Sequence, residues 1–192
     1  MTRCLFFDTE TAGLPKSYKV PMEKLDNWPR VVQLAWMLCD GGFDKTLEEG
    51  SVIVKPDGFE IPKASSDLHG ITTERALKEG KPLAEVLSKF DEVLGITELL
   101  VAHNLKFDRN VMGSEFLRCG MSTENLVSKD TFCTMLDTVN ICRLPRKGYK
   151  GFKYPKLNEL YEFLFKRRMW GGHDALADTQ ACAKCFFEIV KE

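Results

Sequence analysis

Four acidic residues and one histidine in this chain could together bind metal ions and activate water. They are Asp8, Glu10, Asp108, His173 and Asp178. Carboxylates that converge at one point repel one another unless divalent cations neutralise them. A histidine beside such ions can act as a general base. If the fold brings these five residues together, the expected chemistry is two-metal hydrolysis of phosphodiester bonds in nucleic acid.

Asp8 and Glu10 lie two positions apart and directly follow the apolar run of residues 5–7. On a strand, side chains two apart face the same side, so both carboxylates can reach the same ions. Ligands that are all oxygen suit Mg²⁺ or Mn²⁺ better than zinc. The alternative is a pair of solvated carboxylates in a turn, since a D-x-E sequence arises about once by chance at this composition.

Asp108 lies four positions after Asn104, which is expected to cap the start of a helix. An acid in the first turn could instead serve only to stabilise the helix dipole. His173 and Asp178 lie five positions apart, across the expected start of the last helix. The glycines at 171 and 172 would give the histidine a mobile mount, whereas Asp178 would be fixed on the helix. This combination favours a functional role for the histidine.

The apolar and turn patterns predict a mixed five-stranded α/β sheet flanked by helices. Strands are expected over residues 3–8, 30–39, 51–55, 99–103 and 131–135, and helices over 73–78, 83–94, 105–118, 157–165 and 174–190. The first three strands should form an antiparallel meander, after which strands alternate with helices. Thr72 or Thr73, Asn104 and Asp174 are the expected helix caps. The acids would then lie at strand ends and helix starts.

The size and composition are those of a single globular domain, residues 1–192. The net charge of −1 excludes a general electrostatic attraction to nucleic acid or membrane, so phosphate must be attracted by local clusters. Seven scattered cysteines suggest reduced thiols. Cys182 and Cys185 are expected to be buried helix residues rather than half of a zinc site. No signal peptide or membrane span is evident, which predicts a cytoplasmic protein without membrane partners.

Four segments in a fixed order resemble the motifs of a known enzyme family. DTETAGLP, HGIT, AHNLKFD and HDALADT are similar to those of the DEDDh 3′→5′ exonucleases, and the resemblance covers residues 3–190. It implies a ribonuclease H-like fold with two Mg²⁺ or Mn²⁺ ions, bound by Asp8, Glu10, Asp108 and Asp178. His173 would deprotonate the attacking water. One ion would bind that water and the other would stabilise the leaving 3′ oxygen.

The same resemblance implies which residues hold the terminal nucleotide. Thr9 and Thr11 would contact it through their backbone, and Leu14 would act as an apolar wedge. His69 and Asn104 would line the nucleotide pocket.

A basic segment, residues 143–156, is not explained by these motifs. It contains six basic residues and no acidic ones, interleaved with three aromatic residues. Cations for phosphates and rings for stacking are the components of a single-strand groove. The residues expected to contact the strand are Arg146, Lys147, Lys150 and Lys153. The alternative is an ordinary solvated loop, because Lys and Arg side chains are usually exposed.

The sequence therefore predicts a metal-dependent 3′→5′ exonuclease that releases nucleoside 5′-monophosphates, with single-stranded DNA as the favoured polymer. The alternatives are an exoribonuclease and a catalytically inactive nucleic-acid-binding module. The last helix is expected to end at the chain terminus, Glu192, so that no tail remains to tether a polymerase. This favours a stand-alone nuclease. A polymerase or repair partner could still bind a surface of the domain.

Overall fold

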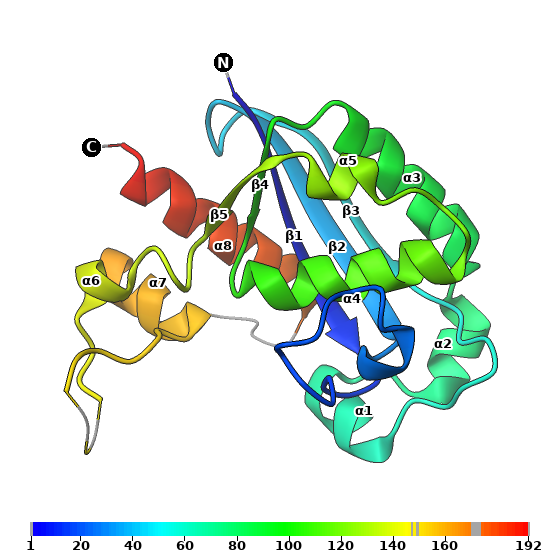
Figure 1. Cartoon of the computed structure of the whole chain (residues 1–192). Helices are drawn as coiled ribbons and strands as arrows, with labels where there is room; N and C mark the ends of the chain where they lie inside the picture. Colours follow the sequence, from blue (N-terminus) through cyan, green and yellow to red (C-terminus); the bar gives the residue numbers. More distant parts are fainter. Residues whose placement is uncertain (1, 147, 149, 170–173, 192) are drawn as a thin grey trace.

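The computed structural model describes residues 2–146, 148, 150–169 and 174–191 (Figure 1). Its centre is a five-stranded sheet of order β3-β2-β1-β4-β5. The strands are β1 (Arg3–Thr11), β2 (Val31–Asp40), β3 (Thr46–Ile53), β4 (Leu99–Ala102) and β5 (Asp130–Cys133). β1 pairs antiparallel with β2, and β2 with β3, whereas β1 with β4 and β4 with β5 are parallel. The predicted mixed, ribonuclease H-like sheet is confirmed.

Helices cover both faces of this sheet. They are α1 (Lys63–His69), α2 (Thr73–Glu79), α3 (Leu83–Gly95), α4 (Leu105–Arg118), α5 (Glu124–Val127), α6 (Val139–Cys142), α7 (Leu157–Phe165) and α8 (Ala175–Ile189), with a 3₁₀ turn η1 (Leu25–Asn27). Figure 1 shows α3 and α4 on one side of the strands and α8 on the other. None of the helices in the described part of the chain has both the length and the apolar character that crossing a membrane requires.

The alternation of side chains along β1 divides the core into two layers. Leu5 and Phe7 pack with residues of α3 and α4, whereas Cys4 and Phe6 pack with α8. Even-numbered positions of β1 therefore face α8, because successive side chains on a strand point to opposite faces. This parity decides which side of the sheet each acid of the D-x-E pair reaches.

The cysteines of the last helix are part of this core. Cys182 is 2% exposed and Cys185 is fully buried, as predicted, and all seven cysteines are free thiols. Burial raises the pKa of the Cys185 thiol to about 12, so this thiol stays protonated and unreactive at neutral pH.

Several elements differ from the sequence prediction. β1 does not end in a turn at Asp8 but continues to Thr11, because residues 9 and 10 keep pairing with Leu34 and Gln33 of β2. β3 begins at Thr46 rather than at residue 51, and α1 was not predicted at all. Asn104 occupies the predicted N-cap position of α4, but its backbone is left-handed (φ 70°) and its side chain makes no capping hydrogen bond.

Candidate metal centre

Three of the predicted acids converge at the end of β1. One ligand oxygen from each of Asp8, Glu10 and Asp178 lies within 4.8 Å of the others. Asp8 and Glu10 occupy even positions of β1 and therefore face α8, which carries Asp178 in its first turn. The start of α8 is fixed by Asp174, whose side chain accepts hydrogen bonds from the backbone of Leu176 (3.1 Å) and Ala177 (3.0 Å). The strand alternation and this cap together position the three carboxylates.

Asp108 reaches the same region from the opposite face of the sheet. It lies in the first turn of α4, is 3% exposed, and is not one of the three closest acids. Its Oδ1 accepts hydrogen bonds from the backbone N–H (3.1 Å) and the hydroxyl (2.7 Å) of Thr9. Thr9 lies between Asp8 and Glu10, so these bonds connect Asp108 to the D-x-E strand.

The acids perturb one another because they are shielded from water. Burial, followed by repulsion from Asp108, Asp178 and Glu10, raises the pKa of Asp8 well above its ordinary value. Burial and the charges of Asp178 and Asp108 raise the pKa of Glu10 to about 7. Burial also raises the pKa of Asp108 to about 7, although the Thr9 hydrogen bonds oppose this shift. Within the described residues, the charges of Asp8, Glu10 and Asp108 are thus poorly compensated.

This donor set fits a hard divalent cation. All the converging ligands are carboxylate oxygens, which Mg²⁺ and Mn²⁺ prefer, and the raised pKa values of Asp8 and Glu10 favour the binding of a cation there. Asp174 adds a further negative charge that raises the pKa of both Asp8 and Glu10. The sequence analysis assigned Asp174 only a capping role, although its position four residues before Asp178 indicated that it would lie near the acidic cluster.

These shifts predict that the metal-free protein loses stability between about pH 6.5 and 8.5. The folded-state pKa values of Asp8, Glu10 and Asp108 are raised, so the folded protein holds protons that the unfolded chain has already released. The stability that these protons provide is lost as pH rises through about 7. We expect Mg²⁺ or Mn²⁺ to restore the thermal unfolding midpoint at the upper pH, because a bound cation replaces the protons.

This pH range avoids the opposing titration of His69 and His103. Burial lowers the pKa of His69 and lowers that of His103 to about 4, so these two residues destabilise the fold only toward lower pH. Thermal unfolding in EDTA and in excess Mg²⁺ at the two pH values measures the effect. A midpoint that is independent of both pH and metal would contradict it.

Most of the predicted nucleotide-binding residues lie around the end of β1. The Thr11 hydroxyl donates to the carbonyl of Gly13 (2.7 Å), and the nearby side chain of Leu14 is 77% exposed. His69 ends α1 and is buried, and its Nδ1 accepts a hydrogen bond from the backbone of Ile71 (3.2 Å). A backbone hydrogen bond with Thr11 partly opposes the lowering of the His69 pKa by burial. The structure therefore brings His69 to the strand end that carries the acids.

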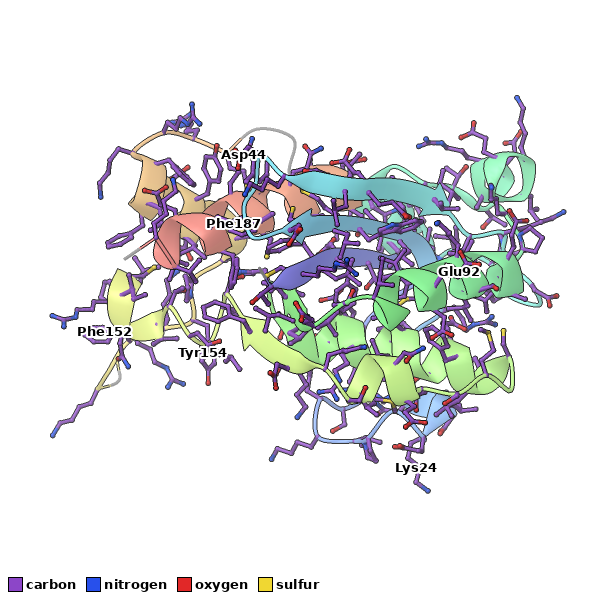
Figure 2. All side chains as sticks on the ribbon, turned by 90° about the horizontal axis from the view of Figure 1, so that it is seen from above. Lys24, Asp44, Glu92, Phe152, Tyr154 and Phe187 are labelled. Atoms are coloured by element: carbon purple, nitrogen blue, oxygen red, sulfur yellow. The ribbon has the colours of Figure 1, made fainter. Side chains whose placement is uncertain are left out.

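Two predicted site residues, His173 and Lys147, lie outside the described residues, as do Gly171, Gly172 and Tyr149. Of the rest of the basic segment, Lys153 forms an ion pair with Glu159, so its charge is partly compensated. Phe152 and Tyr154 are 42% and 62% exposed, and Figure 2 shows both on the outer side of the molecule.

The base of the basic segment is anchored through His103. Its Nε2 lies 3.0 Å from the carbonyl of Pro155, and its Nδ1 lies 3.0 Å from the hydroxyl of Thr134. Sequence reasoning gave His103 no role. Its position at the end of a strand, directly before Asn104, is the feature of the sequence that could have indicated this anchoring role.

Comparison with known proteins agrees with this geometry. The sequence model of the exonuclease family of the RNase T type matches residues 5–186. This chain belongs to that family, the DEDD exonucleases. A PolC-type DNA polymerase III of Caldanaerobacter subterraneus subsp. tengcongensis is 33% identical to this chain over 161 residues, which are 78% of the chain and 10% of the polymerase. A DNA polymerase III subunit epsilon-like protein of Rhodobacter capsulatus is 30% identical over 184 residues, 96% of the chain and 23% of that protein.

Solved structures show the same fold. E. coli Exonuclease I in complex with a dT13 oligonucleotide superposes with a TM-score of 0.78 at 20% identity, over the whole of this chain and 41% of the other chain. The zinc-bound form of the Exonuclease I complex with single-stranded DNA gives a TM-score of 0.77, also at 20% identity. The chain thus spans less than half the length of these proteins.

Proposed function

We propose that this exonuclease removes nucleotides from the 3′ end of single-stranded DNA and releases nucleoside 5′-monophosphates, using two Mg²⁺ or Mn²⁺ ions. The observation that carries the proposal is the convergence of Asp8, Glu10 and Asp178 with ligand oxygens within 4.8 Å of one another. A cluster of poorly compensated carboxylates destabilises the fold. Membership of the exonuclease family explains why the protein nevertheless has this cluster. We further propose that the whole chain, residues 1–192, forms one exonuclease domain.

Each acid has a distinct task in this proposal. Asp8, Glu10 and Asp178 would hold the ions, and Asp108 would complete the set from α4 while it fixes the strand through Thr9. The bound ions would lower the pKa of a water molecule and stabilise charge on the leaving oxygen. His173 would accept the proton of that water. Leu14, which is exposed at the rim, would lie against the terminal base.

The choice of DNA rests on the relatives. Two of them are DNA polymerase III proteins, and a third, 24% identical over 177 residues, is the 3′-5′ exonuclease DinG of Bacillus subtilis. The Exonuclease I structures with this fold contain DNA oligonucleotides. We also propose that Arg146, Lys147 and Lys150 contact the strand beyond the active site.

The test is a 3′-end degradation assay. Single-stranded DNA, duplex DNA and RNA of one sequence, each labelled at the 5′ end, are incubated with Mg²⁺, Mn²⁺ or EDTA. We expect a ladder of 3′-shortened products that forms fastest on single-stranded DNA and disappears in EDTA. Faster shortening of RNA would redirect the proposal to an exoribonuclease. Absence of any degradation in Mn²⁺ would overturn it.

A further inference from the structure

A cluster of cations lies apart from the acidic site, between the C-terminal end of α7 and the outer face of α8. Arg167, Arg168 and Lys184 line a cavity of about 510 Å³ there. The other residues that line it are Tyr161, Met169, Ala177, Gln180 and Ala181. No carboxylate belongs to this lining, so within the described residues the cavity has a positive charge and suits an anion.

In the part of the chain that the structure describes, ion pairs do not neutralise the three cations. Within the described residues, none of them has a carboxylate partner within 4.0 Å. Arg167 instead lies near the rings of Tyr161 (6.0 Å) and Phe165 (5.9 Å). The Lys184 ammonium lies 5.2 Å from the centre of the Phe43 ring. Ring contacts orient a cation without consuming its hydrogen-bond donors, which stay available to a phosphate.

A neighbouring cavity adds apolar surface. It has a volume of about 620 Å³ and shares Arg167 and Lys184 with the first. Its lining includes the rings of Phe43, Phe165 and Phe187, a further cation, Lys191, and the carboxylates of Asp44 and Glu188. Figure 2 shows Phe187 next to Asp44 of the β2–β3 turn. Phosphate-binding cations between aromatic surfaces are the arrangement by which proteins hold single-stranded nucleic acid.

The cluster lies within reach of the acidic site. Ala177 lines the first cavity, and the next residue along α8, Asp178, carries one of the converging carboxylates. From Asp178 to Lys184, α8 rises roughly 9 Å at about 1.5 Å per residue. Successive phosphates of one strand are about 3.4 Å apart along a helical axis and farther apart when extended. A strand whose 3′ end occupies the acidic site therefore carries phosphates at this distance.

We propose that Arg167, Arg168 and Lys184 bind phosphate groups of the substrate strand a few nucleotides upstream of its 3′ end, and that the rings of Phe43 and Phe165 accept an unstacked base. This subsite rests on the proposed exonuclease function. It is separate from the basic segment 143–156, which precedes α7, whereas the cation cluster lies at the other end of that helix.

The experiment measures binding of a fluorescent dT20 strand at several salt concentrations. All proteins carry Asp8→Asn so that the strand is not degraded. Each phosphate contact contributes about 0.7 to the slope of log affinity against log salt on a single strand. We expect Arg167→Gln/Arg168→Gln/Lys184→Gln to reduce this slope by about two and to weaken binding of dT20 more than of dT3.

Matched variants separate the subsite from general charge effects. Arg167→Lys/Arg168→Lys keeps both charges and should retain the slope. Lys55→Gln/Lys78→Gln removes two exposed charges, one between β3 and α1 and one on α2, and should also retain it. Neutralising residues 146, 147 and 150 measures the basic segment in the same way.

The possible failures are distinguishable. If the protein without Asp8→Asn does not shorten dT20, the proposed function fails. The second failure is one in which the protein shortens dT20 but the triple glutamine variant keeps the full salt slope, while its thermal unfolding midpoint shows that it is folded. This result would overturn the subsite, and an acidic protein partner would become the expected ligand of the cluster.

Discussion

Replacement of Asp8 by asparagine is expected to lower the rate of 3′-end hydrolysis about a thousandfold or more. Metal ions supply several kcal/mol of transition-state stabilisation, and about 1.4 kcal/mol corresponds to a factor of ten. Asp8 lies among the three converging acids and bears the repulsion of Asp108, Asp178 and Glu10. Asparagine keeps the shape of the side chain but removes the charge that a cation requires. Initial rates on labelled single-stranded DNA measure the loss.

The same substitution is expected to stabilise the metal-free protein at about pH 8. The raised pKa of Asp8 means that ionisation favours the unfolded chain, and a neutral side chain removes this penalty. Asp67→Asn is the matched control, because Asp67 is exposed and pairs with Lys63 at the surface, away from the acidic cluster. A variant that hydrolyses DNA at the normal rate would remove Asp8 from the metal centre. A lower unfolding midpoint would contradict the charge argument.

The elements that were predicted correctly are those with strong local signals. α7 has its predicted bounds, since its apolar residues recur at helical spacing, and α8 starts at the predicted cap. The β2–β3 hairpin follows from the turn residues 41 and 42. By contrast, the polar end of β1 resembles a turn in the sequence and becomes a strand only through its pairing with Gln33 and Leu34. The first half of β3 is polar for a similar reason, as it lies at the sheet edge.

The acids of the site were also identified from their spacing, but their arrangement was not. The two-residue spacing correctly placed Asp8 and Glu10 on one face. The link from Asp108 to Thr9 spans 99 positions, and no local pattern encodes it. The basic cavity was missed because Arg167 and Lys184 belong to different helices and meet only after α7 and α8 pack together. Contacts between distant segments thus account for what the sequence did not reveal.

Substitution of His173 by alanine is expected to lower the hydrolysis rate by about 10²- to 10⁴-fold, the usual contribution of a positioned base. The chain has three histidines, and two of them are poorly suited to this task. His103 has both ring nitrogens within 3.0 Å of protein oxygens, and burial lowers its pKa to about 4. His69 is buried and accepts a hydrogen bond from the Ile71 backbone. His173 directly precedes Asp174, the cap that positions Asp178.

A metal-binding measurement distinguishes loss of the base from loss of the metal centre. If His173 acts on water and not as a metal ligand, the alanine variant keeps the full Mn²⁺-dependent rise in unfolding midpoint, whereas Asp8→Asn loses most of it. His173→Gly should regain part of its rate when imidazole is added, because the small base can enter the space that the side chain leaves. His103→Gly should show no such rescue, since its ring bridges Thr134 and Pro155. A His173→Ala variant with an unchanged rate at saturating Mn²⁺ would exclude a base at this position and leave water activation to the acidic cluster alone.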